Sequence, residues 1–319
     1  MFKFILSGLM THKTASLPMQ TLAGLSGLNG KAFICLDGGM GQTLIQRSKR
    51  PLSNLWSSDI MFYEPELVTE LHAEFIAAGA DVITLNTYTA TPDRLIANDA
   101  LNWLDTLHEK AFYAAQAAIT ASGKEDVLIA GCLPPLLASY RSDVAPDFAQ
   151  SLASYQQLVA LQSDCDVFLC ETMSSIAEAT AACTAAKASG KPVWLAFSVS
   201  DSAPQKLRGG EPLSEALMTI AEYQPDAVLL NCSRPEAITA ALPTLQSLGV
   251  TTGAYANGFV SVESLYPGET VSTLQSRKDL APAQYAEFAM QWFEQGARII
   301  GGCCEVTPEH IHAVKATLG

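Results

Sequence analysis

The sequence predicts one α/β domain folded as a (β/α)8 barrel, and three observations support this prediction. First, short apolar segments alternate with helical patterns from residue 32 onward. Second, eight such units in about 290 residues suit a barrel closed by right-handed parallel crossovers. Third, polar and special residues follow the strands, as they do at a barrel rim. An open doubly wound sheet is disfavoured because no GxGxxG or Walker-type phosphate loop follows a strand.

Each predicted strand is a short apolar run bounded by turn residues. The strands span 32–36, 81–86, 127–130, 166–170, 193–197, 227–230, 251–256 and 297–300. The helices between them show apolar residues at helical spacing or end at a glycine such as Gly79, Gly123 or Gly190. They span 66–78, 99–122, 147–163, 175–189, 213–223, 235–248 and 282–295, and a last one begins near 307. Thr307-Pro308-Glu309 is a typical helix start.

Composition narrows the class of protein. Of the 319 residues, 49% are hydrophobic and 16% are charged, which is typical of a compact enzyme. The formal net charge of -13 argues against nucleic acid or an anionic membrane surface as a partner. No apolar run reaches the roughly eighteen residues of a membrane span. We expect residues 1–30 to form a loosely ordered N-terminal extension and residues 31–319 to form the barrel of a cytoplasmic protein.

The eight cysteines are too few for a disulfide scaffold in a chain of this length, so we expect reduced thiols. The most informative stretch is Gly301-Gly302-Cys303-Cys304, after the eighth strand. Two glycines free the backbone to turn, so that both sulfurs can converge. Cys232 follows the sixth strand, and these three thiols could share a zinc ion with one open position, as catalytic zinc sites do. The alternatives are a small core residue at Cys232, and a chance pair or redox couple at Cys303 and Cys304.

Five motifs together resemble the homocysteine S-methyltransferase family, which includes betaine- and S-methylmethionine-dependent enzymes. They occur in the family's order and span about residues 32–317: Leu36-Asp37-Gly38-Gly39-Met40-Gly41, Asn86-Thr87-Tyr88-Thr89-Ala90-Thr91, Glu171-Thr172-Met173, Asn231-Cys232-Ser233, and Gly301-Gly302-Cys303-Cys304 followed by Thr307-Pro308-Glu309-His310-Ile311. The resemblance implies a (β/α)8 barrel that holds zinc through Cys232, Cys303 and Cys304. It also implies that homocysteine binds near the turn at 37–39, with Glu171 facing its amino group.

The chemistry agrees with this resemblance. Zinc stabilises a thiolate, so the homocysteine sulfur could attack a methyl group on a cationic donor without a side-chain general base. Asp37 and Glu171 suit the substrate ammonium, and backbone N–H groups around Gly38 suit its carboxylate. The structural alternatives are a turn-forming role for Asp37 and a solvated strand end for Glu171.

The methyl donor is harder to predict. The chain lacks the extra domains of cobalamin-dependent methionine synthases, which favours a direct donor such as S-methylmethionine, S-adenosylmethionine or betaine. The segment from Tyr255 through Tyr266-Pro267-Gly268 departs from the family pattern and should shape the donor pocket. Trp56 offers a face for a sulfonium or quaternary ammonium, or else packs as an ordinary loop residue.

Two other functions stay open at this point. A zinc hydrolase would activate water, but it would require a nearby general base and is less suited to an all-thiolate site. A redox or zinc-sensing protein would use Cys303 and Cys304 as a switch. The expected partners are small molecules, homocysteine and a methyl donor, and the oligomeric state is left open.

Overall fold

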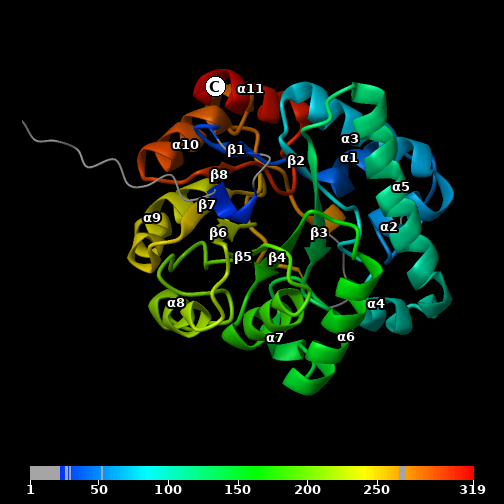
Figure 1. Cartoon of the computed structure of the whole chain (residues 1–319), viewed down its shortest axis with the longest axis horizontal. Coiled ribbons are helices and arrows are strands. Elements are labelled where there is room, and N and C mark those ends of the chain that lie inside the picture. The colour runs from blue at the N-terminus through cyan, green and yellow to red at the C-terminus, as the bar shows by residue number, and fades with distance from the viewer. Residues whose placement is uncertain (1–21, 26–27, 29, 52, 266–270) are drawn as a thin grey trace, which may run out of the picture.

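The computed structural model describes residues 22–25, 28, 30–51, 53–265 and 271–319, and within them the chain forms the predicted barrel. Eight parallel strands pair in the order β1-β8-β7-β6-β5-β4-β3-β2. The ring closes where Asp37 N donates to Val82 O at 3.1 Å and Asp81 N donates to Cys35 O at 2.7 Å. Figure 1 shows helices surrounding this ring. The strands are β1 (Ile34–Cys35), β2 (Val82–Thr84), β3 (Leu128–Leu133), β4 (Val167–Met173), β5 (Val193–Phe197), β6 (Ala227–Asn231), β7 (Thr251–Tyr255) and β8 (Ile299–Ile300).

Successive side chains of each strand face opposite sides of the barrel wall. In β4, Val167 and Leu169 pack inside the barrel, whereas Phe168 and Cys170 pack outward with the helices. Trp194 of β5 is fully buried and is the largest side chain of the interior cluster. Side chains therefore fill the barrel, which leaves the rim at the carboxyl ends of the strands for a pocket.

The eight predicted helices are all present, with shifts at their ends. The helix predicted from residue 99 begins with a short 3-10 turn, η3 (Leu101–Trp103). Three further short helices follow β1 and β2 and were not predicted: α1 (Met40–Arg47), α2 (Ser57–Tyr63) and α4 (Pro92–Ala97). The others are α3 (Pro65–Ala78), α5 (Leu104–Ser122), α6 (Phe148–Leu161), α7 (Ile176–Lys187), α8 (Leu213–Ala221), α9 (Pro235–Leu245), α10 (Pro282–Glu294) and α11 (Pro308–Leu318). Among the described residues, no helix is long and apolar enough to cross a membrane.

The end of β4 differs from the prediction, because the strand continues through Glu171 instead of stopping before it. The pairing register with β5 shifts between Cys170 and Met173, which places one extra residue on β4. Thr172 in this bulge adopts a positive φ of 62°. Such bulges re-aim side chains beside active sites, and this one carries Glu171.

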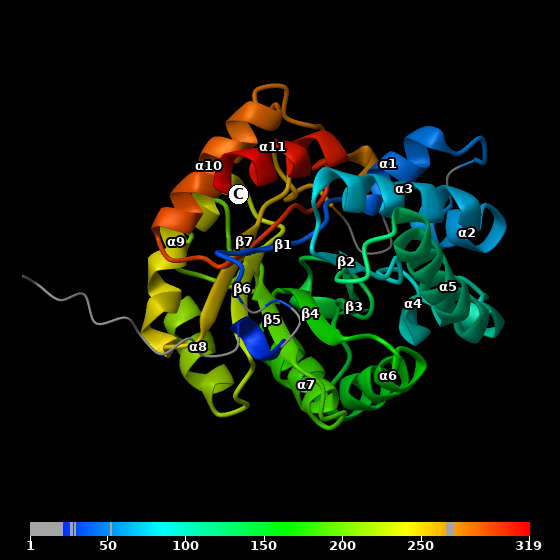
Figure 2. The same ribbon diagram turned by 45° about the horizontal axis from the view of Figure 1, so that its top comes forward.

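Part of the predicted N-terminal extension packs against the opposite end of the barrel. The part of this prediction that concerns residues 1–21 lies outside the described residues, but Ala23, Leu25 and Leu28 are buried and belong to the interior cluster. Trp194 Nε1 donates to Ala23 O at 3.2 Å. Figures 1 and 2 both show η1 (Leu22–Gly24), in blue, beside β5 and β6. Residues 22–25 and Leu28 thus cover the barrel bottom, and the domain boundary near residue 30 stays a prediction.

Candidate active site

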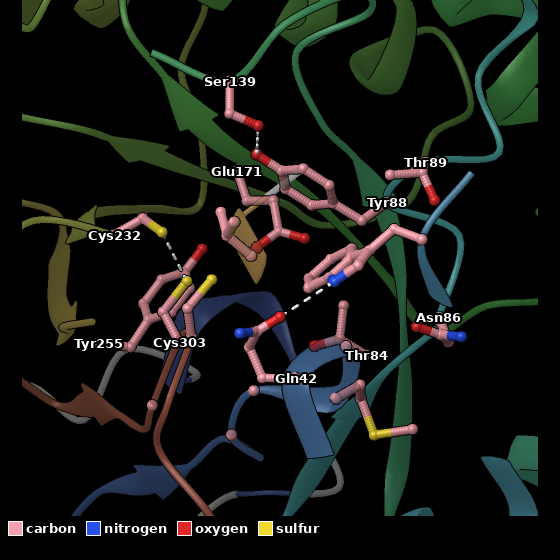
Figure 3. A pocket seen from close by; sticks show the side chains of 18 of the residues that line it. Gln42, Thr84, Asn86, Tyr88, Thr89, Ser139, Glu171, Cys232, Tyr255 and Cys303 are labelled. Carbon is pink, nitrogen blue, oxygen red and sulfur yellow. Dashed lines mark hydrogen bonds between the residues drawn. The ribbon is translucent and has the colours of Figure 1, made fainter. Parts of the chain in front are cut away.

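A pocket opens at the carboxyl ends of the strands, and Figure 3 shows it from close by. Its empty volume is about 940 Å³, including the open mouth. The strand ends and the loops after β1 and β2 form most of its wall. The lining residues include all six predicted site residues: Asp37, Gly38, Glu171, Cys232, Cys303 and Cys304.

The three predicted metal ligands converge on one side of the pocket. The Sγ atoms of Cys232, Cys303 and Cys304 all lie within 4.8 Å of one another, and Cys303 Sγ lies 2.9 Å from Cys232 Sγ. Gly301 and Gly302, before the cysteine pair, are required by close packing and not by an unusual φ. A Cβ on Gly302 would lie 2.1 Å from Val306 Cγ1, and one on Gly301 would lie 2.4 Å from Leu36 Cβ. Glycine therefore lets this turn pass close to its neighbours.

Cys232 sits in a polar environment despite its burial. Its backbone adopts a positive φ of 48°, unusual for a residue with a side chain. The Tyr140 hydroxyl lies 2.8 Å from its Sγ, and Arg208 Nη2 donates to its carbonyl at 3.4 Å. Burial raises the pKa of Cys232, but hydrogen bonds from Cys303, Cys304 and Tyr140, with the charge of Arg208, bring that pKa well below its usual value. A thiolate in this cluster therefore forms first at Cys232.

Asp37 is buried at the end of β1 and already has protein partners. Thr84 N donates to its Oδ2 at 2.7 Å, and Thr84 Oγ1 donates to its Oδ1 at 3.1 Å. Burial raises the pKa of Asp37 to about 7, although the bonds from Thr84 lower it. Asp37 thus joins β1 to β2 while it lines the pocket. Gly38, beside it, has no room for a side chain, because a Cβ would lie 2.3 Å from Val306 O.

Glu171 is buried on β4, and Cys132 of β3 contacts it. The Cys132 thiol donates to Glu171 Oε1 at 2.9 Å. The pKa of Glu171 is raised to about 8, chiefly by burial; the bond from Cys132 lowers it, and nearby Cys232 and Asp37 contribute to the rise. Asn231, next to Cys232 in the chain, accepts from Thr172 N at 3.0 Å and so holds the bulge that carries Glu171. Asn231 therefore couples the cysteine cluster to the carboxylate.

Aromatic residues line the pocket beside the cysteines and the carboxylates; Figure 3 shows Tyr88 and Tyr255 among them. Trp56 Nε1 donates to Gln42 Oε1 at 3.1 Å, and its ring meets that of Tyr88 edge-on at 6.4 Å between centroids. The Tyr88 hydroxyl lies 2.9 Å from Ser139 Oγ. Tyr140 and Tyr255 complete the aromatic lining. Trp56 therefore faces the pocket, while the predicted segment Tyr266-Pro267-Gly268 lies outside the described residues.

Comparison with known proteins identifies the family of the chain. The family model for homocysteine S-methyltransferase matches residues 34–318. The chain belongs to the homocysteine S-methyltransferase family. The Escherichia coli homocysteine S-methyltransferase is 29% identical over 314 residues, covering 91% of this chain and 96% of the relative. The Bacillus subtilis homocysteine S-methyltransferase YbgG is 25% identical over 309 residues, covering 89% and 94%.

Solved structures of a family member agree with the barrel. The homocysteine methyltransferase MmuM from Escherichia coli superposes with a TM-score of 0.76 in both its oxidized and its metallated form. The identities are 29% and 27%, and both matches cover 91% of this chain and 97% of the relative. A metal is thus associated with that family member.

Sequence reasoning missed three polar residues of this homocysteine S-methyltransferase-family site. Tyr140 and Arg94 line the pocket and Cys132 contacts Glu171, yet the sequence assigned none of the three a role in the site. Cys132 and Glu171 are 39 residues apart, and Tyr140 and Cys232 are 92 apart. Contacts at such separations leave no local pattern in a single sequence. The one available signal was their position in the loops and strand ends that form the rim.

Proposed function

We propose that this chain transfers a methyl group from a cationic donor to the thiol of homocysteine, giving methionine, with zinc held by Cys232, Cys303 and Cys304. The observation that carries the proposal is the convergence of three thiols within 4.8 Å of one another on the wall of the pocket, in a chain of this family. The acceptor and donor are small molecules, which suits the size of the pocket.

The donor set suits zinc. Thiolates are preferred zinc ligands, and three of them leave a fourth position for a substrate. Zinc bound there would stabilise the thiolate form of the homocysteine sulfur at neutral pH. The protein contributes the arrangement of the ligands: Tyr140 directs its hydroxyl at Cys232 Sγ, and Arg208 supports the Cys232 carbonyl. Hydrogen bonds of this kind orient metal ligands and tune their charge.

Glu171 and Asp37 would bind the homocysteine ammonium, and backbone groups near Gly38 would bind its carboxylate. Glu171 makes its single side-chain bond within the described residues to the Cys132 thiol, so its carboxylate retains capacity to accept from an ammonium. Asp37 already accepts two bonds from Thr84, so we assign it a smaller part. Binding an ammonium would also offset the burial of the carboxylates.

The alternatives receive less support. A zinc hydrolase would commonly use histidine as ligand or general base, and no histidine is among the described residues that line the pocket. A redox or zinc-sensing role would not require an aromatic pocket beside the cysteines. Family membership also favours methyl transfer.

The test combines metal content with turnover. We expect about one zinc per chain in the reduced protein, and methionine formation from homocysteine with at least one onium donor of a panel. Cys232→Ala, Cys303→Ala and Cys304→Ala should each remove most of the zinc and the activity while circular dichroism stays unchanged. Cys183→Ala, in α7 and outside the pocket, is the control. Full zinc retention by Cys232→Ala would contradict the three-ligand site.

A further inference from the structure

Arg94 brings a positive charge to the pocket wall. It lies on α4, in the connection after β2, and lines the same pocket as the cysteines and Glu171. Its guanidinium carbon lies 5.6 Å from the centroid of the Tyr88 ring. Its Nη2 makes two long contacts at 3.4 Å, to Pro135 O and Ser139 Oγ. All of its side-chain contacts are thus to neutral groups.

The charge of Arg94 has no acidic partner among the residues that the structure describes. No carboxylate oxygen in the described parts of the chain lies within 4.0 Å of its nitrogens. Its Nε is buried and makes no hydrogen bond. The neighbouring Asp93 points elsewhere and accepts from Gln150 Nε2 and Ser154 Oγ. A desolvated guanidinium without a counter-charge is unfavourable, so its position in a binding pocket points to an anionic group on a ligand.

The polar wall runs from Arg94 to the reacting end of the site. Arg94 contacts Ser139, and Ser139 contacts the Tyr88 hydroxyl. The next residue in the chain, Tyr140, directs its hydroxyl at Cys232 Sγ. The pKa of Tyr88 supports this order: burial raises it, the negative charge of Cys232 raises it further, and the charge of Arg94 lowers it. A small molecule lying along Tyr88 would therefore reach from the cysteines to the guanidinium.

We propose that Arg94 binds the carboxylate of the methyl donor, so that the enzyme selects onium compounds that also carry a carboxylate. The planar guanidinium matches a carboxylate with two parallel N–H···O bonds. In the proposed function, the homocysteine ammonium is bound by Glu171 and Asp37, and its carboxylate by backbone groups near Gly38. Arg94 is therefore available to bind the second substrate, the methyl donor. This inference rests on the proposed methyl transfer.

The reaction itself predicts how Arg94 acts. When the methyl group moves, the S–CH3 bond to homocysteine forms and the bond between methyl and onium centre breaks. The bonding electron pair stays on the donor, which becomes neutral at that centre, and the thiol proton is released to solvent. The donor carboxylate keeps its charge throughout. Arg94 would therefore stabilise ground state and transition state alike, and its loss should raise the donor KM and leave kcat nearly unchanged.

The experiment compares S-methylmethionine with its carboxamide on the zinc-loaded enzyme. The wild type should prefer the carboxylate donor. Arg94→Met should raise the KM for S-methylmethionine by about 30-fold or more and change the KM for the carboxamide by less than about threefold. Arg94→Lys should give an intermediate KM. The control is Asp93→Asn, on the same helix but with its side chain bonded to Gln150 and Ser154. The KM for homocysteine should not change in any variant.

Three outcomes would overturn the inference: equal use of both donors by the wild type, equal KM increases for both donors in Arg94→Met, or a loss of homocysteine affinity instead. The first of these needs no variant, so a misfolded Arg94→Met protein would leave the inference testable. Calorimetric titration of each donor without homocysteine separates the inference from the proposed function. If no donor supports turnover, the proposed methyl transfer fails, while the preference for carboxylate binding still tests Arg94.

Discussion

At the residue scale, the proposed ion pair between Glu171 and the homocysteine ammonium depends on the contact that Glu171 makes with Cys132. The Glu171 carboxylate must be ionised to form that ion pair, and burial raises its pKa to about 8. The Cys132 thiol donates to this carboxylate. Burial also raises the pKa of Cys132 well above its usual value, so that the thiol keeps its proton and remains a donor. Cys132 is therefore a positioning residue for Glu171.

The first prediction concerns the pH dependence of homocysteine binding. Affinity should rise with pH as Glu171 ionises, with the midpoint of the rise near pH 8. Cys132→Ala removes a donor to the ionised form, so the pKa of Glu171 should rise and the binding curve should move by about one unit to higher pH. Cys132→Ser keeps a donor and should leave the curve in place or move it to lower pH. Calorimetric titration between pH 6 and about 9 gives these curves.

Glu171→Gln is the control for this experiment. It lacks the Glu171 carboxylate, so the pH dependence that remains belongs to Asp37, the cysteines, and the thiol and ammonium of the substrate. If the curves of wild type and Cys132→Ala coincide, Cys132 has no influence on Glu171, and its contact is packing alone.

The residues that the sequence identified have strong local patterns. Gly301-Gly302-Cys303-Cys304 is a rare tetrapeptide placed after a strand, and Cys232 follows another strand end. The structure brings their sulfurs together. Arg94 and Tyr140 could not be found in this way, because an arginine or tyrosine in a loop is common. The significance of Arg94 depends on the lack of a nearby carboxylate among the described residues, and that of Tyr140 on a cysteine 92 residues away.

At the element scale, the strands and long helices were predictable, whereas α1, α2 and α4 were not. These three helices have 8, 7 and 6 residues. About two turns give too few repeats for the spacing of apolar residues to distinguish a helix from a loop. They nevertheless matter for the site, because Gln42 lies on α1, Trp56 precedes α2 and Arg94 lies on α4.

The second prediction concerns the start of α7. Ser175 is its N-cap and accepts from Glu178 N, while the Ser175 hydroxyl donates to Glu178 Oε2 at 2.9 Å. Burial raises the pKa of Glu178 to about 7. The folded state therefore holds a proton that the unfolded chain releases near pH 4.3. Between these values, the free energy of unfolding should fall as pH rises, with up to about 1.4 kcal/mol per pH unit from this group.

Glu178→Gln keeps the size and the hydrogen bonds of the side chain and removes its titration. The variant should be more stable than the wild type at pH 8, and its free energy of unfolding should vary less between pH 5 and pH 7. Urea denaturation across this range measures both quantities. Glu215→Gln, at an exposed position in α8, is the matched control. Parallel curves for wild type and Glu178→Gln would show that Glu178 is not protonated in the folded protein.

At the scale of the whole molecule, the pocket and the segment that covers the barrel bottom lie at opposite ends of the barrel, so changes at the bottom should affect stability and not activity. The pocket lies at the carboxyl ends of the strands, and Ala23, Leu25 and Leu28 cover the opposite end. The alternation of strands and helices predicted the barrel, because few topologies satisfy the right-handed crossover rule. The cover at the bottom was not predictable. The sequence from 22 to 28 contains small and apolar residues without a strand or helix period, so the burial of Ala23, Leu25 and Leu28 depends on the barrel that they contact.

The last prediction uses Leu28 to test whether the barrel bottom contributes to stability but not to activity. Its side chain has 0% exposure and packs in the cluster that contains Trp194 and Ile34. Leu28→Ala should lower the free energy of unfolding by about 2–5 kcal/mol, because it removes buried methyl groups and leaves a cavity. Leu101→Ala is the matched control, since Leu101 has 46% exposure, and its effect should stay within about 0.5 kcal/mol. Well below the melting temperature, both variants should keep the kcat and KM of the wild type, because the pocket lies at the other end of the barrel. If Leu28→Ala is as stable as the wild type, residues 22–28 do not contribute to the domain, and the barrel is complete from residue 31.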